Sequence, residues 1–265
     1  MPSSIKLKAE LGDDFNVIFV ESQGTSAEGT EAFIYRQRWG ASQGMWTSEP
    51  PCESGSSTLP SFVLLGNNGQ VLITGYPAES KLKDLINAEI KAAKSAPKDT
   101  PAPLVKAYAD FNKGLYANAI LAATKLAETP AAEDKNGMAA LAKERADQWT
   151  KQAKARVERL DYLMSKAQFA KADAEVLALK PALKGLPDLE AKLAEASTKL
   201  AAEDLKVSRE AAKALDNLMA KVNDKGVDDK TTKDLKKLAD KYPGTPPGDR
   251  AAHLAKILEK KPAAD

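Results

Sequence analysis

The sequence predicts an α/β domain over residues 1–94 followed by an all-α domain over residues 104–265. Two apolar runs, Ser61–Leu65 and Val71–Thr74, flank a Gly-Asn-Asn-Gly tetrapeptide. Asn and Gly accept positive φ angles at little cost, so this stretch predicts a β-hairpin. The segment 95–103 contains three prolines and little apolar bulk, which indicates a linker. Beyond it Ala, Lys, Leu, Glu and Asp dominate and no strand-like run occurs, so helices should form the second domain.

The overall composition is that of a soluble globular protein. The 265 residues include 39 basic and 37 acidic side chains, a net charge of +2. A face that binds nucleic acid usually leaves a marked basic excess, so this balance argues against nucleic acid as a partner. No run can span a membrane, and the N-terminus lacks the apolar core of a signal peptide. We expect a soluble protein, cytoplasmic as written, or extracytoplasmic if an upstream signal peptide is missing.

Cysteine and histidine are each present once, as Cys52 and His253. One cysteine excludes an internal disulfide and a Cys-x-x-Cys pair, and one histidine excludes a histidine-rich metal site. We therefore expect no metal and no cofactor. Cys52 lies in Ala41–Ser57, a stretch rich in Gly, Ser and Pro that predicts a long loop. It is either a reactive thiol or, more simply, a lone loop cysteine, and His253 is expected to be a surface or packing residue.

The remaining elements of the first domain follow from apolar spacing and capping residues. They are a short helix ending at Gly12, a buried strand at Val17–Val20, a helix over Ala27–Trp39 and a helix behind the N-cap Ser80. The strand at 61–65 is continuously apolar, which is typical of a strand covered on both faces. The expected order is helix, strand, helix, long loop, proline, strand, turn, strand, helix.

Aromatic and basic side chains in this domain are interpreted as structural. Met45 and Trp46 are expected to anchor the long loop onto the core. Arg36 and Arg38 are expected to lie on a solvated helix face rather than to contact nucleic acid.

This order of elements resembles the thioredoxin family, from the redox helix onward. The resemblance covers about the first third of the chain. It implies that Pro60 matches the family's cis-proline and that the backbone of Leu59 faces a bound substrate; the alternative is an ordinary trans proline that opens a strand. The family's Trp-Cys-x-x-Cys segment and the central strand before it have no counterpart here. We therefore hypothesise that the natural protein begins upstream of Met1.

The helical part contains two similar junctions. Gly114-Leu-Tyr116 is followed by Ala119, and Ala167-Gln-Phe169 is followed by Ala172 in the same place. Both resemble the turn between the helices of a tetratricopeptide repeat, although their separation of 53 residues exceeds the period of about 34 in that family. We expect degenerate, repeat-like helical hairpins. Two long helices are also predicted. One covers Met138–Gln168, between the two junctions, and the other covers Leu189–Val222, after the second junction.

Two functions of different classes are consistent with these patterns. In one, a thioredoxin-like domain without its redox pair is a scaffold, and the helical domain binds a protein or peptide. In the other, the protein is a thiol–disulfide oxidoreductase whose Cys-x-x-Cys lies upstream of Met1 and reacts through a mixed disulfide. The chain as given holds no redox pair and no plausible nucleophile–base set, so no catalytic residue is assigned and the binding protein is favoured.

Overall fold

The computed structural model describes residues 2–39, 45–55, 61–98, 100–130, 134 and 138–259. Its contacts divide the chain into two compact units. The first unit combines Met1–Ile90 with Glu210–Asp265, and the second is Lys91–Arg209. The expected division had one boundary, in the linker at 95–103, whereas these contacts group the C-terminal helices with the N-terminal segment. Each unit is described by itself below.

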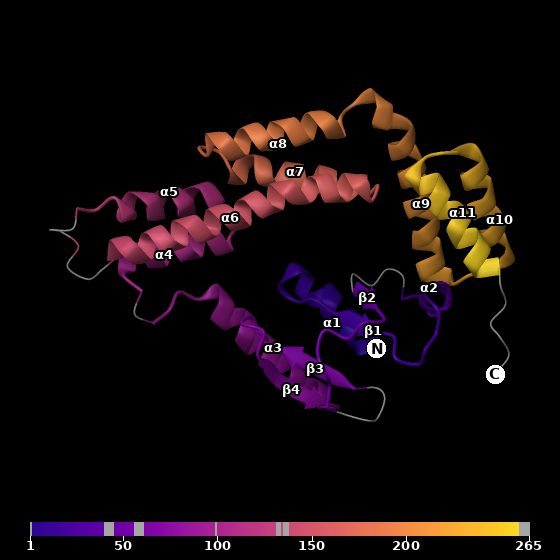
Figure 1. Cartoon of the computed structure of the whole chain (residues 1–265), viewed down its shortest axis with the longest axis horizontal. Coiled ribbons are helices and arrows are strands. Elements are labelled where there is room, and N and C mark those ends of the chain that lie inside the picture. Colours follow the sequence, from indigo (N-terminus) through magenta and orange to yellow (C-terminus); the bar gives the residue numbers. More distant parts are fainter. Residues whose placement is uncertain are drawn as a thin grey trace. The chain divides into compact units, whose positions relative to one another are not determined.

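The first unit mixes helices with two small sheets (Figure 1). Its elements are, in order, α1 (Pro2–Leu11), a 3-10 turn (Gly12–Asp14), β1 (Ile18–Val20), α2 (Ala27–Arg36), β2 (Met45–Thr47), β3 (Phe62–Leu65), β4 (Val71–Gly75), α3 (Glu79–Lys94), α9 (Lys206–Lys225), α10 (Asp229–Lys241) and α11 (Pro246–Glu259). Helix α3 ends, and α9 begins, in the residues that group with the second unit.

The predicted β-hairpin is confirmed. Strands β3 and β4 pair antiparallel, with Val63 opposite Thr74 and Leu64 opposite Ile73. The expectation that β3 is covered on both faces was wrong, because only Leu64 is buried and Leu65 remains 42% exposed. The hairpin has one covered face, on which Leu64 packs with Leu7 of α1 and Ile86 of α3. Ser80 lies inside α3, which begins one residue earlier, so it does not precede the helix as an N-cap.

The stretch expected to be a long loop contains a short strand. Strand β2 pairs parallel to β1, with Trp46 opposite Phe19. The two rings stack with centroids 4.5 Å apart, so Trp46 anchors this segment as predicted. β1 is not fully buried, because Ile18 is 42% exposed. Among the described residues, β1 and β2 form one sheet and β3 and β4 another, so the strands do not share a single sheet.

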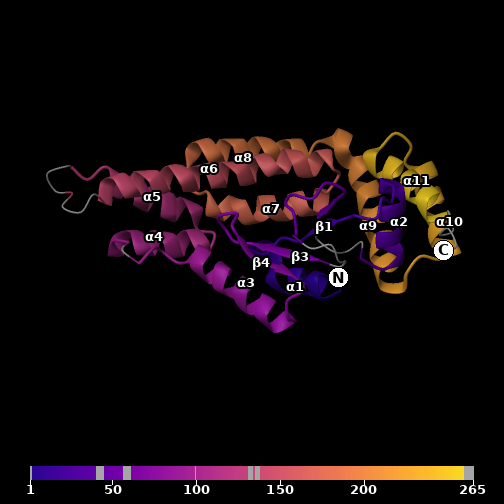
Figure 2. The same ribbon diagram turned by 60° about the horizontal axis from the view of Figure 1, so that its bottom comes forward.

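The described residues of the second unit form helices joined by turns, with no strand among them (Figure 2). Its helices are α4 (Ala102–Asn112), α5 (Tyr116–Ala127), α6 (Met138–Ser165), α7 (Phe169–Ala182) and α8 (Pro187–Leu200), followed by a 3-10 turn (Glu203–Leu205). The long helix α6 lies against α5, α7 and α8. The prediction of a single helix over Leu189–Val222 was wrong. The chain is extended at Ala202 (φ −62°, ψ 141°), and this residue separates α8 from α9.

The two predicted junctions share one backbone conformation. Gly114 has φ +79° and Ala167 has φ +53°, and the residue after each takes nearly the same angles (−85°, 61° at Leu115; −86°, 54° at Gln168). A left-handed residue reverses the chain between two antiparallel helices at both places. The helical hairpins are therefore present, and Ala119 and Ala172, the small residues expected at the helix contacts, are fully buried.

Each junction aromatic lies beneath an arginine that the sequence analysis did not single out. Arg156 lies over the Tyr116 ring and Arg209 over the Phe169 ring, with centroid distances of 5.6 and 5.8 Å. Arg156 also binds Glu175 through two hydrogen bonds of 2.7 and 2.9 Å, and these bonds raise the pKa of the guanidinium. Arg209 binds both carboxylate oxygens of Asp173 in the same unit. The two arginines thus fasten equivalent hairpin turns.

Candidate functional site

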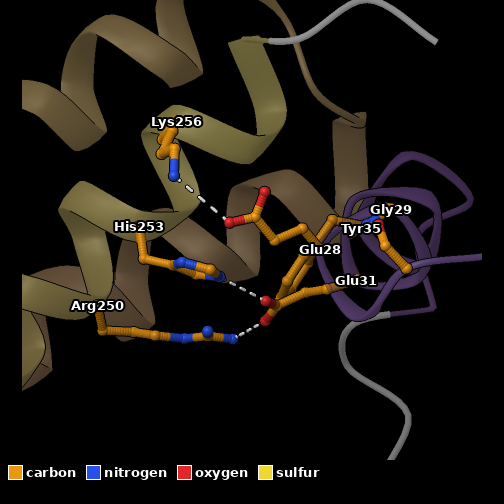
Figure 3. Close-up of polar contacts among 8 residues, drawn as sticks. Glu28, Gly29, Glu31, Tyr35, Arg250, His253 and Lys256 are labelled. Atoms are coloured by element: carbon orange, nitrogen blue, oxygen red, sulfur yellow. Dashed lines mark hydrogen bonds and ion pairs between the residues drawn. The ribbon is translucent and has the colours of Figure 1, made fainter. Parts of the chain in front are cut away.

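A cluster of charged side chains joins α2 to α11 in the first unit. Glu31 of α2 lies between two side chains of α11 (Figure 3). Arg250 donates to Glu31 Oε1, and His253 Nε2 lies 2.7 Å from Glu31 Oε2. One turn away on each helix, Lys256 donates to Glu28 at 3.4 Å. A row of acidic side chains on α2 therefore faces a row of basic side chains on α11.

The end of α2 is fastened by its arginines. Arg36 donates to the carbonyl of Leu258, in the last turn of α11, at 3.4 Å. Arg38 donates to the carbonyls of Asp224 and Lys225 at the end of α9, at 3.1 and 3.3 Å. The last carbonyls of a helix have no partner within it, and a cation is favoured there by the helix dipole. Arg38 is exposed, as expected of a solvated face, and Arg36 is half-buried, but both guanidinium groups also cap helix C-termini.

Apolar packing between α2 and the C-terminal helices is small by comparison. The buried cluster at this place contains one residue of α2, Ala32. All its other buried members come from α9, α10, α11 and the turn at Tyr242. Tyr35 is partly buried against the cluster, and its hydroxyl accepts a hydrogen bond of 3.4 Å from Arg250. Polar contacts therefore carry much of this association.

No protein-family model, curated protein or solved structure matches the chain. The site is therefore interpreted from its own geometry. The described residues hold no group of three or more His, Cys, Asp and Glu side chains placed to bind a metal ion. Nor does any helix in those ranges have the length and apolar character that a bilayer span requires.

The residues proposed from the sequence as a substrate site do not coincide with this cluster. Leu59 and Pro60 lie outside the described residues. Cys52 follows β2 as a half-buried free thiol. His253, expected to be a surface or packing residue, is half-buried on α11 and pairs with Glu31 of α2. The signal that could have identified the site is the three-residue spacing of Glu28 and Glu31 on one helix and of Arg250, His253 and Lys256 on another.

The Glu31 carboxyl makes this association depend on pH. Burial raises the pKa of Glu31, but hydrogen bonds from Arg250 and His253 outweigh burial and hold the pKa below its ordinary value. At pH values above the unfolded-state pKa of about 4.3, the ionised Glu31 therefore stabilises the folded state. This contribution is lost as pH falls through the lower pKa of the folded state.

We expect Glu31→Gln to cost the first unit roughly 1–2 kcal/mol near neutral pH. The difference from the wild type should shrink as pH falls below about 4.3 and should vanish below the lowered pKa of folded Glu31, where both chains carry a neutral side chain. Urea unfolding of both chains across this range measures it. A difference that stays constant with pH would contradict the ion pair.

Proposed function

We propose that this chain is a protein-binding module, in which a thioredoxin-like N-terminal region serves as a scaffold and the helical hairpins bind a protein or peptide. The observation that carries the proposal is the apolar character of α7 on two opposite faces. One face holds Phe169, Ala172 and Leu179, all buried in the second unit. The hairpins themselves also support it, because stacked helical pairs build extended binding surfaces.

The outward side of α7 carries an apolar stripe, which is flanked by the exposed charges of Lys171, Asp173 and Lys180. The stripe comprises Ala170, Ala174, Leu177, Ala178 and Pro181, all of which are exposed. Leu177 is 76% exposed, which together with Tyr76 is the highest value among the large apolar side chains of the described residues. A surface helix normally turns charged residues to solvent on the side opposite its buried stripe. An exposed apolar stripe with charges only at its borders is a feature of surfaces that meet another protein.

The proposal is not catalytic. The single cysteine of the sequence cannot supply a Cys-x-x-Cys pair. With dithiothreitol as reductant, this chain should reduce insulin disulfides no faster than buffer alone. Catalysed reduction that persists in a Cys52→Ala variant would contradict a scaffold role.

Peptide selection against the immobilised chain tests the binding role directly. Selected helical peptides should bind with micromolar affinity, and Leu177→Asp should weaken binding about tenfold or more, as expected for a central apolar contact. The control is Val207→Asp on α9, where valine is 53% exposed. It should change affinity less than about twofold, because Val207 lies on another helix and is not part of the apolar stripe of α7. Equal effects of the two variants, or no selected peptide, would overturn the assignment of α7.

A further inference from the structure

We propose that the basic face of α11 is a receptor surface for an acidic amphipathic helix, and that α2 is a resident occupant that such a helix can replace. The receptor face is defined by Arg250, His253 and Lys256. This inference goes beyond the proposed function, which rests on α7 of the second unit. It identifies another surface and states the chemistry of the partner.

The C-terminal helices do not need α2 to complete their core. Leu215 of α9, Leu235 of α10 and Leu254 of α11 are buried in one cluster, with exposed fractions of 9, 0 and 1%. Helix α2 adds Ala32 to the buried residues of that cluster and packs the partly buried Tyr35 against it. Removing α2 would thus uncover a minor part of the cluster, and the α9–α11 helices would keep their packing with one another. Because the α9–α11 helices stay folded without α2, another helix can take its place on α11.

The contact selects its occupant by charge. Glu28 and Glu31 are three residues apart on α2. The side chains that they contact on α11 also follow one another at three-residue steps: Arg250 and His253 meet Glu31, and Lys256 meets Glu28. Two helices with such rows match only if the acids of one face the bases of the other. The pattern that fits is Glu-x-x-Glu-Ala, with the alanine allowing close approach at the core.

A second anchor lies beyond the acidic row. Arg38 reaches the carbonyl end of α9 from a backbone with φ +61°, a conformation that a side chain of its size rarely adopts. This left-handed residue belongs to the C-terminal turn of α2 itself, in which the Arg38 amide donates to the Tyr35 carbonyl and the Trp39 amide donates to the Ile34 carbonyl. An external helix that ends in the same turn could therefore make the same contacts with α9.

Competition between resident and external helix predicts a measurable affinity difference. When the resident helix covers a surface for about nine tenths of the time, an external helix binds it about tenfold more weakly than its intrinsic affinity. Weakening α2 in its own chain should therefore strengthen binding of the external helix.

The probe is a fluorescein-labelled peptide with the sequence of residues 25–39, titrated by anisotropy against the full chain. The chain carrying Glu28→Gln and Glu31→Gln should bind it about tenfold more tightly than the wild type. The chain carrying Arg250→Glu should lose binding, and a peptide carrying Glu31→Arg should restore it. Far-UV circular dichroism of each chain shows that its helices are retained.

Two results would overturn the proposal. One is that the peptide binds the wild type and the Glu28→Gln, Glu31→Gln chain with equal affinity. Absence of binding to both chains counts as the same result. The other is equal binding of a scrambled peptide of the same composition, because the order of its charged and apolar residues would then not matter. Leu177→Asp should leave this titration unchanged, so failure here does not bear on the function assigned to α7.

Discussion

Replacement of Leu160 by alanine is expected to destabilise the second unit by roughly 2–5 kcal/mol, the cost of removing a large aliphatic side chain from a core. Leu160 is 1% exposed on α6, the helix that lies against α5, α7 and α8. A cavity at this position would weaken several helix contacts together. Urea unfolding of the full chain, followed through the buried Trp149 of the same helix, measures the loss.

The matched control is Arg159→Ala, one residue earlier on the exposed side of α6. Its effect should stay within about 0.5 kcal/mol, as is usual for surface positions. Similar losses for both variants would mean that α6 is not packed as described.

Replacement of Gly248 by alanine is expected to cost the first unit roughly 2–3 kcal/mol. Gly248 is buried in the first turn of α11, and an added Cβ would collide with the backbone carbonyl of Tyr242. Helix propensity alone favours alanine over glycine by about 1 kcal/mol, so the two effects have opposite signs. The collision should dominate, because a backbone carbonyl cannot rotate away as a side chain can.

Gly244→Ala is the comparison for Gly248, because its added methyl group would meet no atom within 4 Å. Its φ of +71° predicts a loss of only about 1 kcal/mol from backbone strain. Thermal unfolding should rank the two variants in this order. A Gly248→Ala chain more stable than the wild type would show that Tyr242 does not lie against the helix start.

Local patterns predicted the local parts of this structure. The hairpin at 62–75 follows from a Gly-Asn-Asn-Gly turn between apolar runs, and the junctions at Gly114 and Ala167 follow from a small residue before a buried aromatic. In each case neighbours in sequence determine the conformation. Strand β2 gave no such signal, because three residues pair parallel with a distant strand and carry no alternation of their own.

The candidate site was missed because it depends on residues far apart in the chain. Glu31 and Arg250 are separated by 219 positions, and neither pattern identifies its partner. Arg36 and Arg38 have the composition of a solvated face, and only the ends of α11 and α9 show what they cap. Charged residues at three-residue spacing indicate a helix face that could pair with an oppositely charged face, but many helices in this chain carry such residues.

Amide hydrogen exchange in α2 tests most directly whether α11 holds this helix. The amides of Thr30 and Gln37, which close the first and last turns of α2, should exchange about tenfold faster in Arg250→Ala than in the wild type. Lys237→Ala, an exposed control on α10, should leave them unchanged. Unaltered protection of α2 in Arg250→Ala would contradict the account, since the helix would then be held by something other than its contact with α11.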